Sequence, residues 1–122
     1  MERFDEFTLG GKSFMYVNVS GLRGNDNFME LIKLIESSVV KYPERSLFVI
    51  TNIENIRFDS DTKVIYAEHL ERYKSYFKHI FFIGLDGAKK AMLNEIFRRT
   101  GQKTVSFAFS KEQAIERMLE LD

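Results

Sequence analysis

The stretch Ile80-Phe81-Phe82-Ile83-Gly84-Leu85-Asp86-Gly87-Ala88 decides the fold, because an apolar run passes through a short turn into a helix. Its first four residues are all apolar, which predicts a strand over residues 80–84 that is covered on both faces. A helix over residues 88–100 follows the two-glycine turn, and Gly101 is typical of the position just past a helix end. A strand followed at once by a helix is the unit from which parallel sheets are built.

The same alternation of strand and helix continues on both sides of this stretch. Apolar runs predict further strands over residues 4–9, 13–19, 46–52 and 105–109. The pair Gly10-Gly11 separates the first two and predicts a tight hairpin.

Helices are predicted from apolar residues at steps of three and four, which form one buried stripe on each helix. The first helix follows the cap residues Asn25 and Asp26 and ends before Pro43, the second opens at Asp59-Ser60-Asp61-Thr62, and the last opens at a capping box begun by Ser110. The stripes are expected at Phe28, Leu31, Ile32, Ile35 and Val39; at Tyr66, Leu70, Tyr73 and Phe77; at Ala88, Met92, Leu93, Ile96 and Phe97; and at Ala114, Ile115, Met118 and Leu119.

The element order β-β-α-β-α-β-α-β-α predicts an α/β fold with a mixed, mainly parallel five-stranded sheet and flanking helices. The first strand should be antiparallel, because a tight hairpin joins it to the second. A chain of 122 residues fits one domain, which we expect to span residues 1–122.

The composition excludes several classes of protein. The 18 Lys+Arg and 18 Asp+Glu give a formal net charge of +0, so no overall field attracts nucleic acid. The absence of Cys removes disulfides, thiolate metal sites and cysteine nucleophiles. No apolar run approaches the ~20 residues of a membrane span, and residues 1–6 do not resemble a signal peptide, so we expect a cytoplasmic protein.

Residues 83–94 run from a strand-ending glycine into a helix start with two lysines, the helix over residues 88–100 ends in Arg98-Arg99-Thr100-Gly101, and Ser110 caps an alanine-containing helix. These segments resemble the STAS/SpoIIAA-like family. Residues 51–58 are similar to that family's strand exit, and the resemblance covers roughly residues 46–121. It implies the fold of anti-sigma-factor antagonists and regulatory or ligand-sensing work in bacteria or archaea.

Ser60 is the phosphorylation candidate that this resemblance implies. Phosphorylated antagonists carry an Asp-Ser-Ser-Gly phrase before the second helix, and the nearest phrase here, Asp59-Ser60-Asp61-Thr62, departs from it after Asp-Ser. A helix start would stabilise a phosphate, whereas the two aspartates would repel it. The alternative is that these residues only cap the helix.

A partner or ligand surface is predicted where the strand at residues 46–52 leads into the second helix. Loops at the carboxyl ends of strands are where open α/β sheets bind ligands. The aromatic residues would line a pocket for a small apolar ligand, or they would serve only as core. The residues assigned to this surface are Asn52, Phe58, Asp59, Tyr66 and Tyr73.

The turn after residue 83 is the anion candidate, formed by Gly84, Gly87, Lys89 and Lys90. A glycine turn aims backbone N–H groups at an anion, and a lysine can neutralise it. The spacing is not that of a P-loop, and the alternative is a tight turn with two solvated lysines.

No catalytic or metal-ligating set stands out. His69 lies in the middle of a helix and His79 precedes a strand, and neither has a spacing typical of a zinc site or of a nucleophile with its base. We therefore expect neither an enzyme nor a bound metal or cofactor.

The predicted function is a non-enzymatic regulatory or protein-interaction module of STAS-like type, controlled by phosphorylation or by a ligand. It would present residues 53–62 and the second helix to a protein partner, or pair with a second copy as a homodimer. The alternative is a protein that binds or senses a small apolar, lipid-like ligand.

Overall fold

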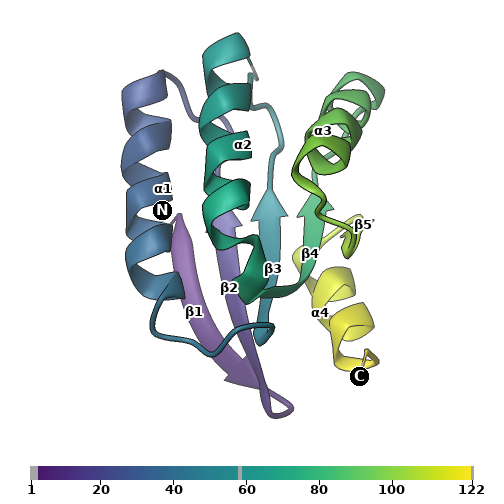
Figure 1. Cartoon of the computed structure of the whole chain (residues 1–122). Coiled ribbons are helices and arrows are strands. Elements are labelled where there is room, and N and C mark those ends of the chain that lie inside the picture. Colours follow the sequence, from purple (N-terminus) through teal and green to yellow (C-terminus); the bar gives the residue numbers. More distant parts are fainter. Residues whose placement is uncertain (1–2, 58, 122) are drawn as a thin grey trace.

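The computed structural model describes residues 3–57 and 59–121 of the chain (Figure 1). Its elements follow the predicted order, with one short 3-10 turn, η1, added before the fourth strand. In chain order they are β1 Phe4–Leu9, β2 Lys12–Asn18, α1 Asn25–Val39, β3 Leu47–Asn52, α2 Ser60–Tyr73, η1 Lys74–Tyr76, β4 Phe77–Ile83, α3 Gly87–Thr100, β5 Val105–Phe107 and α4 Lys111–Leu119.

The strands form one sheet in the order β1-β2-β3-β4-β5. β1 is antiparallel to β2, while β2, β3, β4 and β5 are parallel to their neighbours. In the middle of the sheet, Tyr16 of β2 lies opposite Ile50 of β3, which lies opposite Phe81 of β4. The predicted α/β class with a mixed, mainly parallel five-stranded sheet is confirmed.

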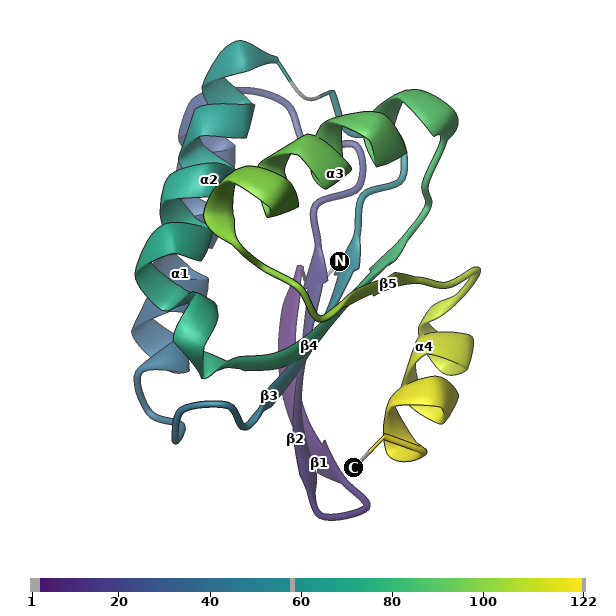
Figure 2. The same cartoon turned by 45° about the vertical axis from the view of Figure 1, so that its right-hand side comes forward.

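Helices cover both faces of the sheet, three on one side and one on the other. Figures 1 and 2 show α1, α2 and α3 against one face and α4 against the opposite face. Because successive residues of a strand point to opposite faces, Val49 of β3 packs in the larger core under α1 to α3, and Phe48 and Ile50 pack in the smaller core under α4. The continuous apolar run of β3 therefore reflects burial on both faces.

Side chains cap the helices α2 and α4 as the sequence predicts. The carboxylate of Asp59 accepts a hydrogen bond of 2.8 Å from the backbone N–H of Thr62. The hydroxyl of Ser110 accepts one of 3.0 Å from the N–H of Gln113, whose side-chain oxygen accepts one of 2.7 Å from the N–H of Phe109. These caps satisfy backbone donors that the first turn leaves free.

The start of α1 differs from the prediction. Its N-cap is Gly24, which makes no side-chain cap hydrogen bond, so Asn25 and Asp26 lie inside the first turn and do not cap it. Gly24 has a φ of 86°, a backbone conformation that glycine adopts without a steric penalty.

The assignment of Phe77 to the second helix is wrong. α2 ends at Tyr73, η1 follows, and Phe77 is the first residue of β4, where it pairs with Leu47 of β3. Phe77 is nevertheless buried in the core under α1 to α3. The spacing of four residues between Tyr73 and Phe77 fits a helix. However, β4 begins at Phe77, three residues earlier than predicted, and the strand places Phe77 in the same core.

The predicted stripe of α1 is confirmed, since all five of its residues are buried. The stripe of α3 is rotated: Leu93, Ile96, Phe97 and Thr100 are buried, while Ala88 is exposed. The first turn of α3 extends past the end of the sheet (Figure 2), so Ala88 has no strand to cover. On α4, Ala114 and Met118 are buried, whereas Leu119 is 38% exposed.

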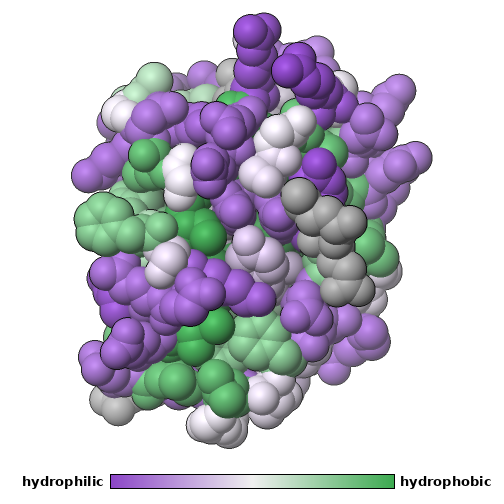
Figure 3. Space-filling view, turned by 180° about the vertical axis from the view of Figure 1, so that it is seen from behind, coloured by the Kyte–Doolittle hydropathy of each residue, from purple (hydrophilic) through white to green (hydrophobic). Residues whose placement is uncertain are grey.

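The outer surface is mainly hydrophilic where Figure 3 shows it, with apolar residues in separate groups between charged ones. Some apolar surface of this kind is normal, because polar residues are too few to cover a folded protein completely. Among residues 3–57 and 59–121, no helix is both long enough and apolar enough to cross a lipid bilayer.

Candidate functional site

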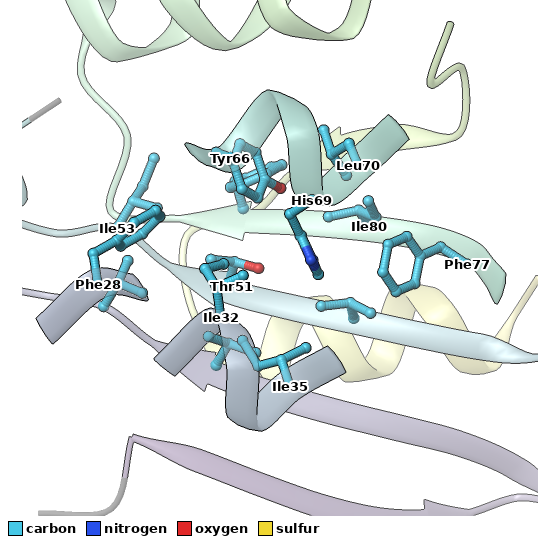
Figure 4. A pocket seen from close by; sticks show the side chains of 14 residues that line it. Phe28, Ile32, Ile35, Thr51, Ile53, Tyr66, His69, Leu70, Phe77 and Ile80 are labelled. Atoms are coloured by element: carbon cyan, nitrogen blue, oxygen red, sulfur yellow. The ribbon is translucent and has the colours of Figure 1, made fainter. Parts of the chain in front are cut away.

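A small cavity lies inside the larger core, between the sheet and the helices α1 and α2. Its volume is about 30 Å³, which is room for about two water molecules. Figure 4 shows the 14 side chains that line it. Apolar side chains form most of the wall and include Phe28, Ile35, Val49, Leu70, Ile80 and Phe82.

Three polar side chains interrupt this apolar wall. Thr51 of β3 is 8% exposed, and Tyr66 and His69 of α2 are 9% and 4% exposed. Figure 4 shows the hydroxyl of Tyr66 beside α2 and the ring of His69 extending from α2 toward α1. Among the described residues, neither hydroxyl has a hydrogen-bond partner, and His69 is bonded through Nδ1 alone. Buried polar groups are normally hydrogen-bonded. Among the described residues, the one fully buried side-chain polar atom without a partner is Oε1 of Gln102, which does not line the cavity, so the three polar groups here keep access to the cavity space.

The imidazole of His69 is held by the neighbouring helix. Its Nδ1 lies 2.9 Å from a carboxylate oxygen of Glu36 on α1, and Arg72 reaches the same oxygen at 3.0 Å. Because a carboxylate accepts hydrogen bonds, Nδ1 carries the proton and Nε2 keeps a free lone pair. Burial lowers the pKa of His69, and this effect exceeds the opposing effect of the hydrogen bond and charge of Glu36. His69 is therefore a neutral acceptor at neutral pH.

The stability of the fold should decrease as His69 is forced to take up a proton. An unfolded histidine has a pKa of about 6.5, and the folded pKa is lower, so the unfolded chain binds more protons between the two values. The stability is fully present above about pH 6.5 and falls below it, by up to about 1.4 kcal/mol per pH unit for one group. Urea denaturation at pH 5, 6, 7 and 8 measures this.

Burial also lowers the pKa of the half-buried His79. The contributions of the two histidines to the pH dependence of stability must therefore be measured separately. The variant His69→Gln should lose most of the pH dependence, and His79→Gln should keep it. An unchanged slope between pH 5 and 6.5 in His69→Gln would show that His69 is not the group that titrates.

Tyr66 is a neutral phenol in this environment. Burial raises the pKa of its hydroxyl well above the ordinary value of 10.0. Its ring stacks on the ring of His69 at a centroid distance of 6.0 Å and meets the edge of Phe82 at 6.3 Å. These contacts fix the direction of the hydroxyl, which can donate one hydrogen bond and accept another.

A second hollow, the carboxyl-end cleft, lies beside the cavity at the carboxyl ends of β2 and β3. Its volume is about 270 Å³. The loop before α1 contributes Leu22, Arg23 and Gly24, and the loop before α2 contributes Asn55, Ile56, Arg57 and Asp59. Phe28 lines both the cleft and the cavity, so its side chain is a common wall between them.

The predicted partner surface is divided among different places. Asp59 lines the cleft, and Tyr66 lines the cavity. Asn52 donates a hydrogen bond of 3.3 Å to the hydroxyl of Tyr16, which packs in the core under α4, so Asn52 points to the opposite face of the sheet. Tyr73 lies at the far end of α2 against Tyr76. Phe58 lies outside the described residues.

Ser60 is exposed at the first position of α2, directly after the cap residue Asp59. The helix start is thus already engaged by a carboxylate. Phosphorylation of Ser60 stays a prediction.

The lysines and the helix start of the anion candidate already contact other groups of the protein. The carboxylate of Asp86 accepts a hydrogen bond of 2.9 Å from the N–H of Lys89 at the start of α3. The ammonium of Lys89 lies 3.5 Å from Asp86 and donates to the carbonyl of Ile53 at 3.2 Å. Lys90 lies over the ring of Phe107, with its ammonium 5.4 Å from the ring centre. The positive φ of Gly84, 81°, and the close approach of Glu54 give this glycine a structural role.

Sequence reasoning did not single out Thr51, His69, Arg23 or Arg57 as site residues, although Arg57 lies within the predicted partner surface of residues 53–62. One signal was present for His69, because it follows Tyr66 by three residues and therefore lies on the buried face of the same helix. Thr51 belongs to a strand whose alternation places it beside Val49 on the core side. The two arginines lie in loops, where no periodicity predicts which way a side chain points.

Comparison of the sequence with known protein families and with curated proteins finds no match. Among residues 3–57 and 59–121, no three metal-ligating side chains gather in one place.

Proposed function

We propose that the protein is a non-enzymatic, ligand-sensing regulatory module, whose ligand is a small, largely apolar molecule with one hydrogen-bonding group. The observation that carries this proposal is that Thr51, Tyr66 and His69 line one otherwise apolar cavity, with no hydrogen-bond partners among the described residues for the two hydroxyls and Nε2. Ligand sites are typically apolar pockets with a few precisely placed polar groups.

The three polar groups indicate which hydrogen-bonding group the ligand carries. Nε2 of His69 accepts a hydrogen bond, because Nδ1 donates to Glu36. The hydroxyls of Tyr66 and Thr51 can donate. A ligand hydroxyl satisfies both requirements at once, since it donates to Nε2 and accepts from one of the two hydroxyls. A charged group would be disfavoured here because of the cost of removing it from water.

The small volume of the cavity supports a sensing role. A ligand larger than about two water molecules enters only if α1 or α2 moves away from the sheet. Glu36 on α1 holds His69 and Arg72 on α2, so the two helices would respond together. A ligand that favours a displaced position of these helices changes the outer surface and so transmits its presence to a partner.

The hydroxyl of Tyr66 provides the test of this proposal. We expect 1-hexanol to bind the protein, and Tyr66→Phe to bind it about fivefold more weakly, because one hydrogen bond contributes about 1 kcal/mol. The free variant should melt at the same temperature or higher, since it no longer buries that hydroxyl. Titration calorimetry measures the affinity, and a thermal melt measures the stability.

Tyr73→Phe is the matched control, because Tyr73 is on the same helix but does not line the cavity. It should bind 1-hexanol as the unchanged protein does. The proposal is wrong if 1-hexanol does not bind, or if the two tyrosine variants bind it equally.

Docking of a protein partner is the second candidate function, favoured by the exposure of the α2 surface, where Val64 is 54% exposed. The strand order with an antiparallel first strand also supports the proposal that the chain is STAS/SpoIIAA-like. The two functions are compatible, since a ligand-driven shift of α2 would alter this surface.

A further inference from the structure

The carboxyl-end cleft carries an excess of positive charge. Arg23 and Arg57 line it from two different loops, and Asp59 is the one carboxylate among the residues that line it. Hydrogen bonds from Thr62 lower the pKa of Asp59, so its carboxylate is ionised at neutral pH. The two cations and one anion that line the cleft leave a net charge of one positive among the lining residues, and the carboxylate of Asp61 accepts a hydrogen bond of 3.3 Å from Asn25, which also lines the cleft. Neither guanidinium has an ion-pair or hydrogen-bond partner among the described residues.

The cleft also receives the start of α1. Gly24 and Asn25 line it, and Gly24 gives no side-chain cap to the first turn. Backbone N–H groups at a helix start favour negative charge. Asp26 is in the same turn but does not line the cleft.

The cleft and the cavity are neighbours along both helices. Phe28 of α1 lines both of them, and on α2 Thr62 lines the cleft while Tyr66 and His69 line the cavity. The helical rise of 1.5 Å per residue places Tyr66 about 6 Å and His69 about 10 Å beyond Thr62. A short chain would therefore be long enough to reach from one hollow to the other once the side chain of Phe28, which separates them, moves aside.

We propose that the ligand is a hydroxy-carboxylate of short chain length, with its carboxylate between Arg23 and Arg57 in the cleft and its hydroxyl on Thr51, Tyr66 and His69 in the cavity. This inference rests on the proposed function and specifies its ligand class. A simple fatty acid fits less well, because its methyl end would leave the three polar groups of the cavity without a partner.

The charge of the cleft favours a carboxylate over a phosphate. One net positive charge balances a single negative charge, whereas a phosphate monoester carries about −1.5 to −2 at neutral pH. Asp59 would repel the second charge. Arginine also binds carboxylates through two parallel hydrogen bonds, a geometry that is stronger than a single contact.

The test compares three probes of equal chain length: 6-hydroxyhexanoate, 1-hexanol and hexanoate. We expect 6-hydroxyhexanoate to bind about tenfold more tightly than either of the other two, because it alone engages both hollows. Arg23→Gln and Arg57→Gln should each weaken 6-hydroxyhexanoate about fivefold and leave 1-hexanol unchanged. The matched control is Arg98→Gln, which removes an exposed arginine of α3 that does not line the cleft. Titration calorimetry at low ionic strength measures each affinity.

The outcomes separate this inference from the proposed function. If 1-hexanol binds but 6-hydroxyhexanoate binds no more tightly, the carboxylate site is wrong and the cavity site stands. If 6-hydroxyhexanoate binds more tightly but the Arg23 and Arg57 variants behave like Arg98→Gln, the carboxylate lies elsewhere and the inference is overturned. If none of the three probes binds, the proposed function fails as well.

Discussion

Replacing Phe82 with aspartate is expected to unfold the protein. Phe82 is 1% exposed on β4 and lines the cavity, and its ring centre lies 5.5 Å from that of Phe97. The variant loses a buried aromatic ring, which typically costs about 3–5 kcal/mol, and places an unpaired charge in an apolar core, which costs several more. The sum is comparable to the total stability of a typical domain, about 5–15 kcal/mol. Circular dichroism at 25 °C should show the loss of the native spectrum.

Two further variants make this prediction specific. Ile50→Asp should have the same effect from the opposite face, because Ile50 is 0% exposed in the core under α4. Phe109→Asp should remain folded, since Phe109 is 95% exposed. If Phe82→Asp melts cooperatively at a temperature near that of the unchanged protein, the side chain of residue 82 is not buried in the core as described.

The strands could be predicted because they are buried on both faces. β3 and β4 are covered by α1 to α3 on one side and by α4 on the other, so residues 47–50 of β3 and residues 80–83 of β4 are apolar without interruption. The stripe of α1 was equally clear, since Phe28, Leu31 and Ile35 repeat at helical spacing and are all buried. In these elements, the residue pattern alone shows which faces are buried.

The boundary between α2 and β4 could not be predicted in this way. Tyr73 and Phe77 are four residues apart, which fits a helix, but the chain turns through η1 between them. Both residues pack on the ring of His69, with centroid distances of 5.8 and 5.9 Å. Since one core receives side chains from the helix end and from the strand start, the apolar spacing does not show where one element ends.

Of the residues that line the cavity and the cleft, Tyr66 and Asp59 could be assigned to a partner or ligand surface from the sequence. Tyr66 could be assigned to a cavity wall from its type and position, because buried tyrosines normally need a partner for the hydroxyl. The meeting of Tyr66 with Thr51 depends on how α2 lies across β3, and the meeting of Arg23 with Arg57 depends on two loops. These contacts are between segments far apart in the sequence, so no local pattern encodes them.

The cleft also depends on a glycine outside it. Gly84 follows β4 with a φ of +81°, and a Cβ there would lie 2.7 Å from the backbone N and 2.8 Å from the Cα of Glu54. Glu54 precedes Asn55, Ile56 and Arg57, which line the cleft. The backbone N–H of Ile53 donates a hydrogen bond of 3.0 Å to the carbonyl of Ile83, so the loop is held against the end of β4. Any side chain at Gly84 would push this loop away.

Gly84→Ala should therefore cost about 2–5 kcal/mol of stability, about 1–2 from the left-handed conformation and about 1–3 from the displaced backbone. Because the displaced loop carries Arg57, the variant should also bind 6-hydroxyhexanoate more weakly, while Gly87→Ala should change neither property. Gly87 is the matched control: it is the first residue of α3, and a Cβ there meets nothing within 4 Å. Urea denaturation measures the first effect, and titration calorimetry of the folded variant measures the second. If the two alanine variants are equally stable, the loop accommodates a methyl group at residue 84 without loss of stability. The close packing of Gly84 against Glu54 then does not position the cleft.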